Sequence, residues 1–344
     1  MRYSRQTILP EVGEQGQQKL KNASVLMIGA GGLGCPVLLY LAAAGVGRLG
    51  IVDVDKVDVT NLHRQVLYTM EDEGKMKAEV AARRLIALNP EINIDVYPLW
   101  LSKENVLGIF SSYDIIVDGS DNFATRYLVN DACVILNKPL VFGSIFKFEG
   151  QVSVFNYKNG PTYRCLFPEA PAAGEVPNCS EIGVIGVLPG IIGSLQANEV
   201  IKIILEKGDV LSGTLFMYDA LTNNIQQLKV ARNPNVSAIT ELGNYEEVCL
   251  TTPDIDKMTF DQWKAKGVVF QLIDVREPNE YAQKNIGGEL IPLNTLQSHT
   301  DRIRMDIPVV IHCQMGGRSK KAADFLYSKG YKNIFNLKNG LLEF

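Results

Sequence analysis

The chain of 344 residues carries 34 basic and 38 acidic side chains, so its formal net charge is −4. That length predicts two domains, or one large domain with an appendage. The near balance of charge argues against a strongly basic nucleic-acid-binding protein. Six scattered cysteines without a C-x-x-C pair argue against a disulfide framework and remove the plainest signal of a zinc site.

The first ten residues, MRYSRQTILP, are polar and charged, so we expect no secretion signal. We also expect no membrane span, because the longest apolar stretch, residues 183–205, is interrupted by a proline and by polar residues. A cytoplasmic protein with reduced cysteines is therefore expected.

Short apolar runs alternate with helical patterns from residue 24 onward, which predicts an α/β fold. Helices are expected after the first strand up to residue 44, at residues 76–88 and at residues 123–136. A long segment rich in proline, glycine and alanine, residues 156–182, precedes the last strand, and such a loop is usually functional. The predicted strands are residues 24–29, 48–53, 113–118, 139–142, 151–155 and 214–218.

The periodic pattern weakens across residues 232–252, and a second α/β series follows it. We expect a large domain at residues 1–240, a linker at 241–256 and a small α/β domain at 257–344. The elements predicted for the small domain are strands at residues 268–275 and 308–312 and helices near 259–266 and 319–329.

A glycine-rich loop, GAGGLG at residues 29–34, lies where the first predicted strand turns into a helix. Glycines let the backbone approach a phosphate closely, and the helix N-terminus presents unpaired N–H groups. Asp53 ends the second predicted strand, where an acid can accept hydrogen bonds from ribose hydroxyls. The large domain is therefore expected to be Rossmann-like with a mixed sheet. The candidate nucleotide-binding residues are Gly29, Gly31, Gly32, Gly34 and Asp53.

The default nucleotide of such a domain is NAD, but the residues that follow favour ATP. Arg64 and Lys77 come after Asp53, and such cations neutralise phosphate charge. Asp121 follows the strand at residues 113–118, at the carboxyl edge of the sheet, where it could hold Mg²⁺. An enzyme that transfers hydride from NAD does not need cationic groups and Mg²⁺ around a triphosphate. Surface charge on a helix is the alternative for Arg64 or Lys77 taken alone.

Five separated motifs occur in order, namely RYSRQ, GAGGLG, VDVDKVDVTNLHRQ, Lys77 and VDGSDN. Together they resemble the ThiF/MoeB family, relatives of ubiquitin-activating enzymes, over residues 2–234. The resemblance implies a homodimeric adenylyltransferase that uses Mg²⁺ and ATP. Its substrate would be the C-terminal glycine carboxylate of a ubiquitin-like sulfur-carrier protein.

The same resemblance implies roles for individual residues. Asn61, Arg64 and Lys77 would contact ribose or phosphates beside Gly32 and Asp53. The acid essential for adenylation, linked to Mg²⁺, would be Asp121, with Asn122 next to it in the nucleotide site. Arg5 would reach the phosphates in the partner subunit.

Cys179 lies within residues 156–182 and matches the position of the family's loop cysteine, which implies thiol chemistry on the activated carrier. An inert thiol is the alternative, because accessibility alone does not make a cysteine reactive. Two C-x-x-C pairs of many relatives would fall on Thr162 and Cys165 and on Val236 and Ile239. Only Cys165 is a cysteine, so we expect no structural zinc.

Two other cysteines, Cys35 and Cys133, fall on apolar helical patterns and are expected in the core. Cys249 lies in the expected linker and has no assigned role.

The motif HCQMGGRS at residues 312–319 places a cysteine between a predicted strand and a helix that begins near Ser319. The loop N–H groups, the helix dipole and Arg318 would lower the pKa of the Cys313 thiol and make it nucleophilic. A buried structural cysteine is the alternative. Cysteine phosphatases place five residues between cysteine and arginine, whereas four intervene here.

That tighter loop resembles the rhodanese sulfurtransferases, over residues 258–344. The motif DVRE at residues 274–277 and the ending NGL at 339–341 belong to the same resemblance, while Asn285 stands where many rhodaneses have histidine. It implies that Cys313 carries a persulfide, supplied by a donor such as a cysteine desulfurase.

The two resemblances together imply adenylation of a carrier that ends in Gly-Gly, followed by attack of the Cys313 persulfide and release of a thiocarboxylate. One alternative is an adenylating enzyme whose sulfurtransferase domain acts separately. Another is a scaffold that binds ATP and a ubiquitin-like protein without turnover. The pathway of the carrier, whether molybdopterin, thiamine or tRNA thiolation, stays open, and neither nucleic acid nor membrane is an expected partner.

Overall fold

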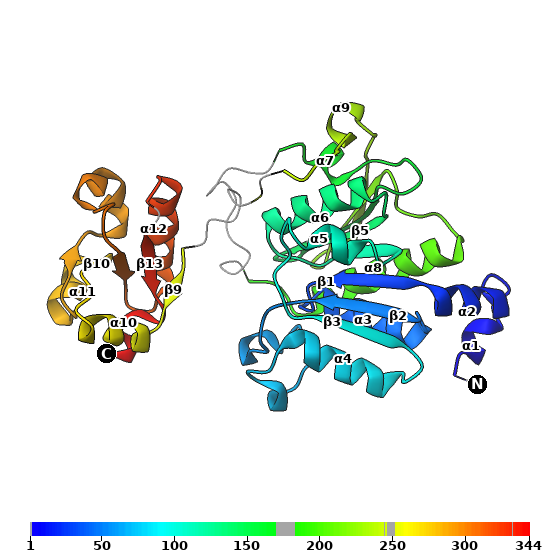
Figure 1. Ribbon diagram of the computed structural model, residues 1–344, viewed down its shortest axis with the longest axis horizontal. Helices are drawn as coiled ribbons and strands as arrows, with labels where there is room; N and C mark the ends of the chain where they lie inside the picture. Colours follow the sequence, from blue (N-terminus) through cyan, green and yellow to red (C-terminus); the bar gives the residue numbers. More distant parts are fainter. Residues whose placement is uncertain (1, 170–182, 244, 246–251, 332) are drawn as a thin grey trace. The chain divides into compact units, whose positions relative to one another are not determined.

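The computed structural model describes residues 2–169, 183–243, 245, 252–331 and 333–344. The described residues up to Tyr245 form one compact unit, and those from Thr252 onward form a second (Figure 1). The expected linker, residues 241–256, contributes to both units. Tyr245 donates a hydrogen bond to Asp131 in the first, whereas Asp254–Ile255 forms a strand in the second.

The first unit is built on an eight-stranded sheet in the order β3-β2-β1-β4-β5-β6-β7-β8. The strands from β3 to β5 run parallel, and those from β5 to β8 run antiparallel, so the sheet is mixed as predicted. The strands are β1 Ser24–Ile28, β2 Arg48–Val52, β3 Asn93–Tyr97, β4 Ile115–Asp118, β5 Leu140–Phe146, β6 Glu149–Phe155, β7 Thr214–Asp219 and β8 Asn224–Lys229.

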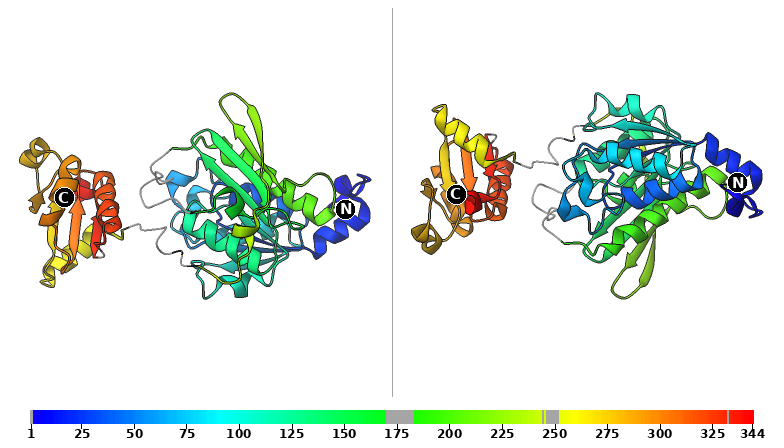
Figure 2. Two further views of the ribbon diagram at one scale, coloured as in Figure 1. Left: turned by 90° about the horizontal axis from the view of Figure 1, so that it is seen from above. Right: turned by 90° about the horizontal axis from the view of Figure 1, so that it is seen from below.

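Helices cover both faces of this sheet (Figures 1 and 2). Residues of α3, α4 and α8 pack with one set of strand residues, and residues of α5 and α6 pack with the other. The helices of the unit are α1 Ser4–Thr7, α2 Gly13–Asn22, α3 Gly34–Ala44, α4 Lys77–Leu88, α5 Val106–Phe110, α6 Phe123–Ile135, α7 Tyr163–Leu166, α8 Val187–Leu205 and α9 Pro234–Ser237.

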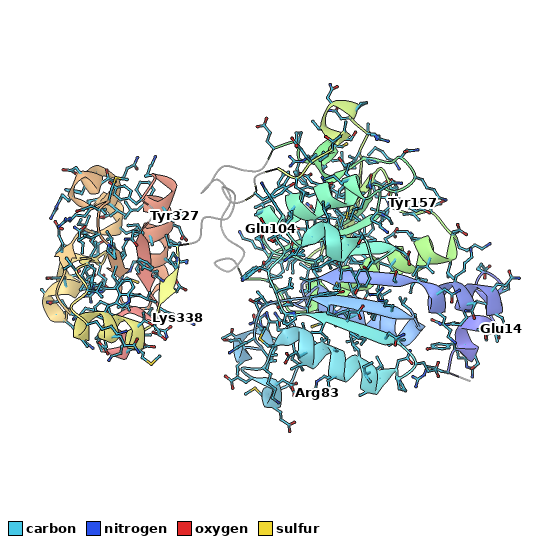
Figure 3. The ribbon with its side chains drawn as sticks, viewed as in Figure 1. Glu14, Arg83, Glu104, Tyr157, Tyr327 and Lys338 are labelled. Carbon is cyan, nitrogen blue, oxygen red and sulfur yellow. The ribbon has the colours of Figure 1, made fainter. Side chains whose placement is uncertain are left out.

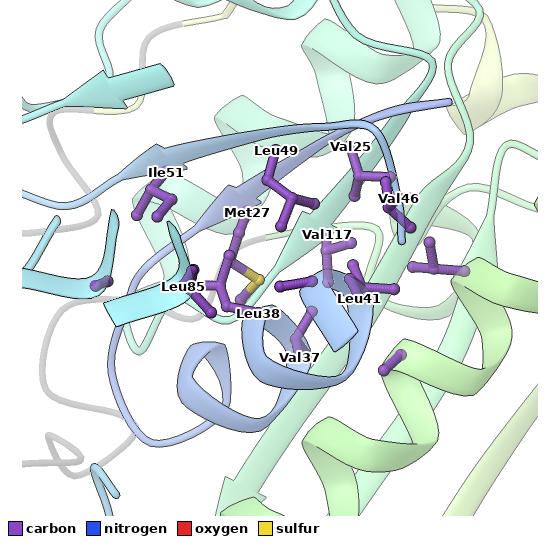
Figure 4. Packing of buried hydrophobic residues seen from close by; sticks show 14 of the residues in the cluster. Val25, Met27, Val37, Leu38, Leu41, Val46, Leu49, Ile51, Leu85 and Val117 are labelled. Carbon is purple, nitrogen blue, oxygen red and sulfur yellow. The ribbon is translucent and has the colours of Figure 1, made fainter. Parts of the chain in front are cut away.

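Strand β1 is apolar at almost every position because it lies in the interior of the sheet. Alternate side chains of a strand point to opposite faces, and both faces are buried here. Val25 and Met27 pack with α3 (Figure 4), whereas Leu26 and Ile28 pack on the side of α5 and α6. Charged side chains such as Glu14 and Arg83 lie on the outer surfaces of α2 and α4 (Figure 3).

Helix α8 contains most of residues 183–205, the apolar stretch that the sequence offered as the best candidate for a membrane span. By length and composition alone it is the one helix among the described residues that is long and apolar enough, with half of its apolar window buried. It packs against α3, β5 and β6, and Pro189 lies in its first turn, where no N–H partner is lost. Its buried Gln196 donates to the carbonyl of Asp118, so the helix forms part of the core.

Some elements were not predicted from the sequence. Strand β8 is exposed along its whole length and contains only two apolar residues, Ile225 and Leu228, and β3 is an edge strand, so neither has a long apolar run. Strand β5 continues past the predicted residue 142 to Phe146, because it pairs with β6 across a tight hairpin. The described part of the long segment 156–182 contains the short helix α7.

The second unit has a parallel sheet in the order β11-β10-β12-β13-β9. Its strands are β9 Asp254–Ile255, β10 Gln271–Asp274, β11 Glu289–Leu290, β12 Val309–His312 and β13 Ile334–Leu337. Its helices are α10 Lys257–Ala265, α11 Pro278–Gln283 and α12 Gly317–Ser328, with the 3₁₀ segments Leu293–Arg302 and Gly340–Glu343.

Candidate active sites

The carboxyl ends of four parallel strands lie level with one another in the first unit. Ile28 of β1 is in register with Val52 of β2 and with Asp118 of β4, and Val52 is in register with Tyr97 of β3. The segments that follow these strands therefore meet at one edge of the sheet, where ligands bind in open α/β folds.

The glycine loop after β1 is tight enough to require glycine at its two ends. Gly29 has φ of +86°, a backbone conformation that other residues rarely adopt. A Cβ at Gly34 would lie 2.0 Å from the carbonyl oxygen of Gly29. The loop thus brings its backbone to the start of α3 with no side chain in the way at either end.

A cavity of about 390 Å³ opens at this edge of the sheet. Its lining includes the predicted nucleotide-binding residues with one exception, Gly34, which begins α3. The predicted residues that line it are Gly29, Gly31, Gly32, Asp53, Asn61, Arg64, Lys77, Asp121 and Asn122.

Lys77 is 5% exposed, so it is not the surface charge that the alternative interpretation proposed. Its Nζ lies 2.9 Å from a carboxylate oxygen of Asp55, which is itself largely exposed. Arg64 is half-buried and donates to the side-chain oxygen of Asn61 at 2.7 Å. Both cations are therefore held at the cavity by neighbours from the same stretch of chain.

Asp53 accepts hydrogen bonds from the N–H groups of Ala30, at 2.7 Å, and Asp55, at 2.8 Å. Burial raises the pKa of its carboxyl, although the charge of Lys77 and these two N–H groups oppose that rise. The contact with Ala30 ties the acid directly to the glycine loop.

The segment after β4 carries two of the predicted residues. Asp121 is exposed at the cavity, and Asn122 caps α6, since its side-chain oxygen accepts a hydrogen bond from the N–H of Thr125 at 2.8 Å. Nowhere in the described residues do three Cys, His, Asp or Glu side chains gather as a metal site of protein ligands alone would require.

Several cavity residues were missed from the sequence. Gln65, Ser120 and Arg126 line the cavity, are buried, and each has a polar atom with no hydrogen-bond partner: Oε1, Oγ and Nε respectively. A polar ligand in the cavity would satisfy such atoms. Gln65 ends the motif VDVDKVDVTNLHRQ and Ser120 lies within VDGSDN, and this position in the motifs is the signal that identifies them. Lys147, at the tip of the β5–β6 hairpin, also lines the cavity.

Two other candidates, Arg5 and Cys165, do not line this cavity. Arg5 is exposed in α1, and Cys179 lies outside the described residues. Cys165 is half-buried, and its Sγ accepts hydrogen bonds from the N–H groups of Thr162 and Asn233 at 3.4 and 3.3 Å. Cys35 and Cys133 are buried in the core, as expected, and burial raises the pKa of the Cys35 thiol to about 12.

In the second unit, Cys313 follows β12 and is 1% exposed. Its Sγ accepts hydrogen bonds from the N–H of Gly316 at 3.2 Å and from the hydroxyl of Ser319 at 3.4 Å. Burial opposes ionisation, but the hydroxyl and N–H of Ser319 and the N–H groups of Met315 and Gly316 outweigh it. The pKa of the thiol is therefore lowered, the direction that favours a nucleophilic thiolate.

Arg318 forms its hydrogen bonds with Glu280, and its positive charge attracts the Cys313 thiolate from beside the loop. Its guanidinium donates to both carboxylate oxygens of Glu280, at 2.7 and 2.6 Å, and the hydrogen bonds to Cys313 come from Gly316 and Ser319. Ser319 was noted in the sequence only as the helix start. Its place in the first turn of α12, six residues after the cysteine, is the signal that identifies it.

Arg276, in the motif at residues 274–277, contacts the loop that follows Cys313. Arg276 is fully buried, pairs with Asp274, and lies 3.3 Å from the side-chain oxygen of Gln314. His312 is also fully buried, and burial lowers its pKa.

Comparison with known proteins gives two family matches. The ThiF family matches residues 3–238, and the rhodanese-like domain matches residues 259–344. A sulfur carrier protein adenylyltransferase of Thermus thermophilus is 55% identical over 259 residues, covering 72% of this chain and 96% of that protein. A probable adenylyltransferase/sulfurtransferase MoeZ of Mycobacterium tuberculosis is 42% identical over 359 residues, covering 99% and 91%.

Among solved structures, E. coli MccB with ATP superposes with a TM-score of 0.61 at 27% identity, covering 70% of this chain and 74% of that one. The share of this chain that MccB covers is about the size of the first unit.

Proposed function

Since the chain belongs to the ThiF family and ends in a rhodanese-like domain, we propose that it adenylates a ubiquitin-like sulfur-carrier protein and then transfers sulfur to it. The relative that covers nearly the whole chain is named an adenylyltransferase/sulfurtransferase, and the Thermus relative a sulfur carrier protein adenylyltransferase. The observation that carries the proposal is the meeting of the glycine loop, Lys77 and Asp121 around one cavity.

In the first step, ATP lies in the cavity with its phosphates against the N–H groups of the glycine loop and near Arg64 and Lys77. Asp53 accepts hydrogen bonds from the ribose hydroxyls, and Asn61 contacts the ribose or the phosphates. The carrier's terminal carboxylate attacks the α-phosphorus, and the bond to pyrophosphate breaks. No general base is needed, because the carboxylate is already ionised near neutral pH. Catalysis is then positioning plus neutralisation of charge on the phosphate oxygens.

Asp121 is the residue that would hold Mg²⁺, with Asn122 beside it. Its carboxylate is exposed at the cavity, and the described residues supply no further acidic cluster around it. That donor set fits a magnesium ion whose remaining ligands are phosphate oxygens and water, since magnesium is usually held by one or two carboxylates. The ion would neutralise charge on the triphosphate.

Arg5 would act in the active site of a second subunit. It lies outside the cavity, and a homodimer would let this arginine act on the phosphates bound by the partner. Asp121 and Lys77 belong to the subunit that binds the nucleotide.

In the second step, the terminal sulfur of a Cys313 persulfide attacks the acyl carbon, and AMP leaves with the electrons of the C–O bond. The product is an acyl disulfide on Cys313. Attack by the Cys179 thiol on Sγ of Cys313 then forms a disulfide between the two cysteines and releases the thiocarboxylate. The lowered pKa of the Cys313 thiol supports this role, and a cysteine desulfurase is the proposed source of the persulfide sulfur.

We further propose a cytoplasmic location, because ATP and free thiols such as Cys313 suit a reducing compartment. No structural zinc is part of the proposal. The Sγ of Cys165 already accepts two backbone hydrogen bonds, and a single thiolate cannot build a tetrahedral site. Elemental analysis that found about one zinc per chain would contradict this.

The test uses the full chain, ATP, a persulfide donor and purified carriers that end in Gly-Gly. We expect carrier-dependent ATP–pyrophosphate exchange and, by mass spectrometry, replacement of one carboxylate oxygen of the carrier by sulfur. Cys313→Ala should abolish thiocarboxylate formation but leave the exchange unchanged, while Cys165→Ala should leave both unchanged.

Other outcomes identify the alternatives. Full thiocarboxylate formation by Cys313→Ala would mean that the two units act separately. Absence of pyrophosphate release with every carrier would indicate a scaffold without turnover.

A further inference from the structure

Trp100 is a large aromatic side chain that lines the cavity of the first unit and is still 68% exposed. Its neighbours Leu99 and Leu101 line the cavity as well. This apolar wall contrasts with the charged wall formed by Arg64 and Lys77. The side chain of Trp100 is therefore accessible to a ligand that enters the cavity.

The sheet determines what lies beside this wall. The N–H of Asp53 donates to the carbonyl of Tyr97 at 3.2 Å, so the segment that follows β3 starts next to the ribose acid. From β1 to β3, the edge presents the glycine loop, then Asp53, then residues 99–101. A nucleotide with its phosphates at the loop and its ribose on Asp53 directs its base toward Trp100.

The backbone at Trp100 is held in place although the ring is exposed. The N–H of Leu99 donates to the carbonyl of Tyr97 at 2.9 Å. The side-chain amide of Asn105 donates to the carbonyl of Trp100 at 2.8 Å and accepts from the N–H of Ser102 at 2.9 Å. The indole therefore projects from a fixed segment, which reduces the entropy lost when a flat ligand packs on it.

We propose that Trp100 stacks on the base of the bound nucleotide and sets the affinity of the first unit for ATP. The proposal rests on the proposed adenylation function. Stacking of a base on an aromatic side chain is worth enough for its loss to weaken binding about tenfold. Trp100 is a binding residue in this proposal and takes no part in the transfer of the adenylyl group.

The chain offers a direct spectroscopic test because it contains two tryptophans, Trp100 and Trp263. Trp263 belongs to the second unit, where it packs against Phe270 and Phe335. Titration of the full chain with ATP and Mg²⁺, without carrier, should change the tryptophan emission. The change should persist in Trp263→Phe and disappear in Trp100→Phe.

Kinetics supply the second readout. In the carrier-dependent exchange assay, Trp100→Ala should raise KM for ATP about tenfold and change kcat by less than about twofold, because the ring stacks equally in the ground state and the transition state. In Trp100→Phe, KM for ATP should stay close to the wild-type value, because phenylalanine also stacks on a base. A residue needed only for folding would lower kcat in both variants.

The outcomes separate this proposal from the function on which it rests. An unchanged KM in Trp100→Ala, or an emission change that survives in Trp100→Phe, overturns the stacking proposal while the exchange activity of the wild type stands. Emission of Trp100 that responds to the carrier alone also overturns it, since the ring would then belong to a docking surface. Failure of the wild type to exchange with any carrier, together with an ATP-dependent signal from Trp100, contradicts adenylation and supports the base site.

Discussion

Arg318 and Glu280 form a bidentate ion pair beside the Cys313 loop, with N–O distances of 2.7 and 2.6 Å. Arg318 is the one charged side chain among residues 313–318, so the pair leaves that loop without an uncompensated charge. The hydrogen bonds to the Cys313 sulfur come from neutral donors, namely the N–H groups of the loop and the hydroxyl of Ser319.

Ser319→Ala should raise the pKa of the Cys313 thiol. The hydroxyl donates to Sγ, and loss of a hydrogen bond to a charged acceptor should shift the pKa upward by about one unit. The pH profile of alkylation by iodoacetamide, followed at Cys313 by mass spectrometry, measures the shift. Thr295→Ala in the same unit, whose hydroxyl donates to the carbonyl of Pro292, should leave the profile unchanged. An identical profile for Ser319→Ala would mean that the N–H groups alone lower the pKa.

Glu280→Gln should destabilise the second unit at neutral pH but not in acid. The Arg318 guanidinium lowers the pKa of Glu280 from 4.5 to about 2. A carboxyl whose pKa is lower in the folded state adds stability above its unfolded pKa and loses it as the pH falls through the folded pKa. The difference in stability between wild type and variant should therefore shrink between pH 4.5 and about 2.

Urea denaturation in a Trp100→Phe background, with Trp263 as the reporter, measures this difference. Glutamine keeps an acceptor for the N–H of Glu277, so the start of α11 stays capped. A difference that does not vary with pH would attribute the effect to packing of the longer side chain.

Asp121→Ala should abolish carrier-dependent ATP–pyrophosphate exchange. The carboxylate is the exposed acid at the cavity edge that follows β4, and its loss removes the proposed protein ligand of the magnesium ion. Asp306→Ala, which removes an exposed acid of the second unit paired with Arg304, should exchange normally. Full exchange by Asp121→Ala would remove this residue from the mechanism.

Lys77→Met should lower kcat for exchange at least about 100-fold, because it removes a buried cation from the developing charge on the phosphates. Methionine keeps an apolar side chain of similar reach and limits the loss of packing. Lys75→Met is the matched control, since Lys75 lies two residues away and is half exposed. Exchange that stays normal in Lys77→Met would assign the lysine to its ion pair with Asp55 alone.

Much of the fold follows from local patterns. The glycine loop, Asp53 at the end of β2 and the helix after β4 were predicted because each depends on a short stretch with strand or helix periodicity. Polar or edge elements such as β8 and β3 were not predicted, because they bury too little apolar surface to show a pattern. Residues that act through a distant partner, such as Glu280, were missed for a related reason, since their role depends on which side chain faces them.

The sequence by itself determined the α/β class, the two families and the residue types that each site needs, because these depend on contiguous motifs. The tertiary structure decided which of those residues meet. Gly31, Asp53, Lys77 and Asp121 lie far apart in the chain and line one cavity, because parallel strands in register bring their carboxyl ends to one edge. It also decided that Arg318 faces Glu280 and that Trp100 stands exposed at the cavity that Asp53 lines, since both depend on long-range packing that no local pattern encodes.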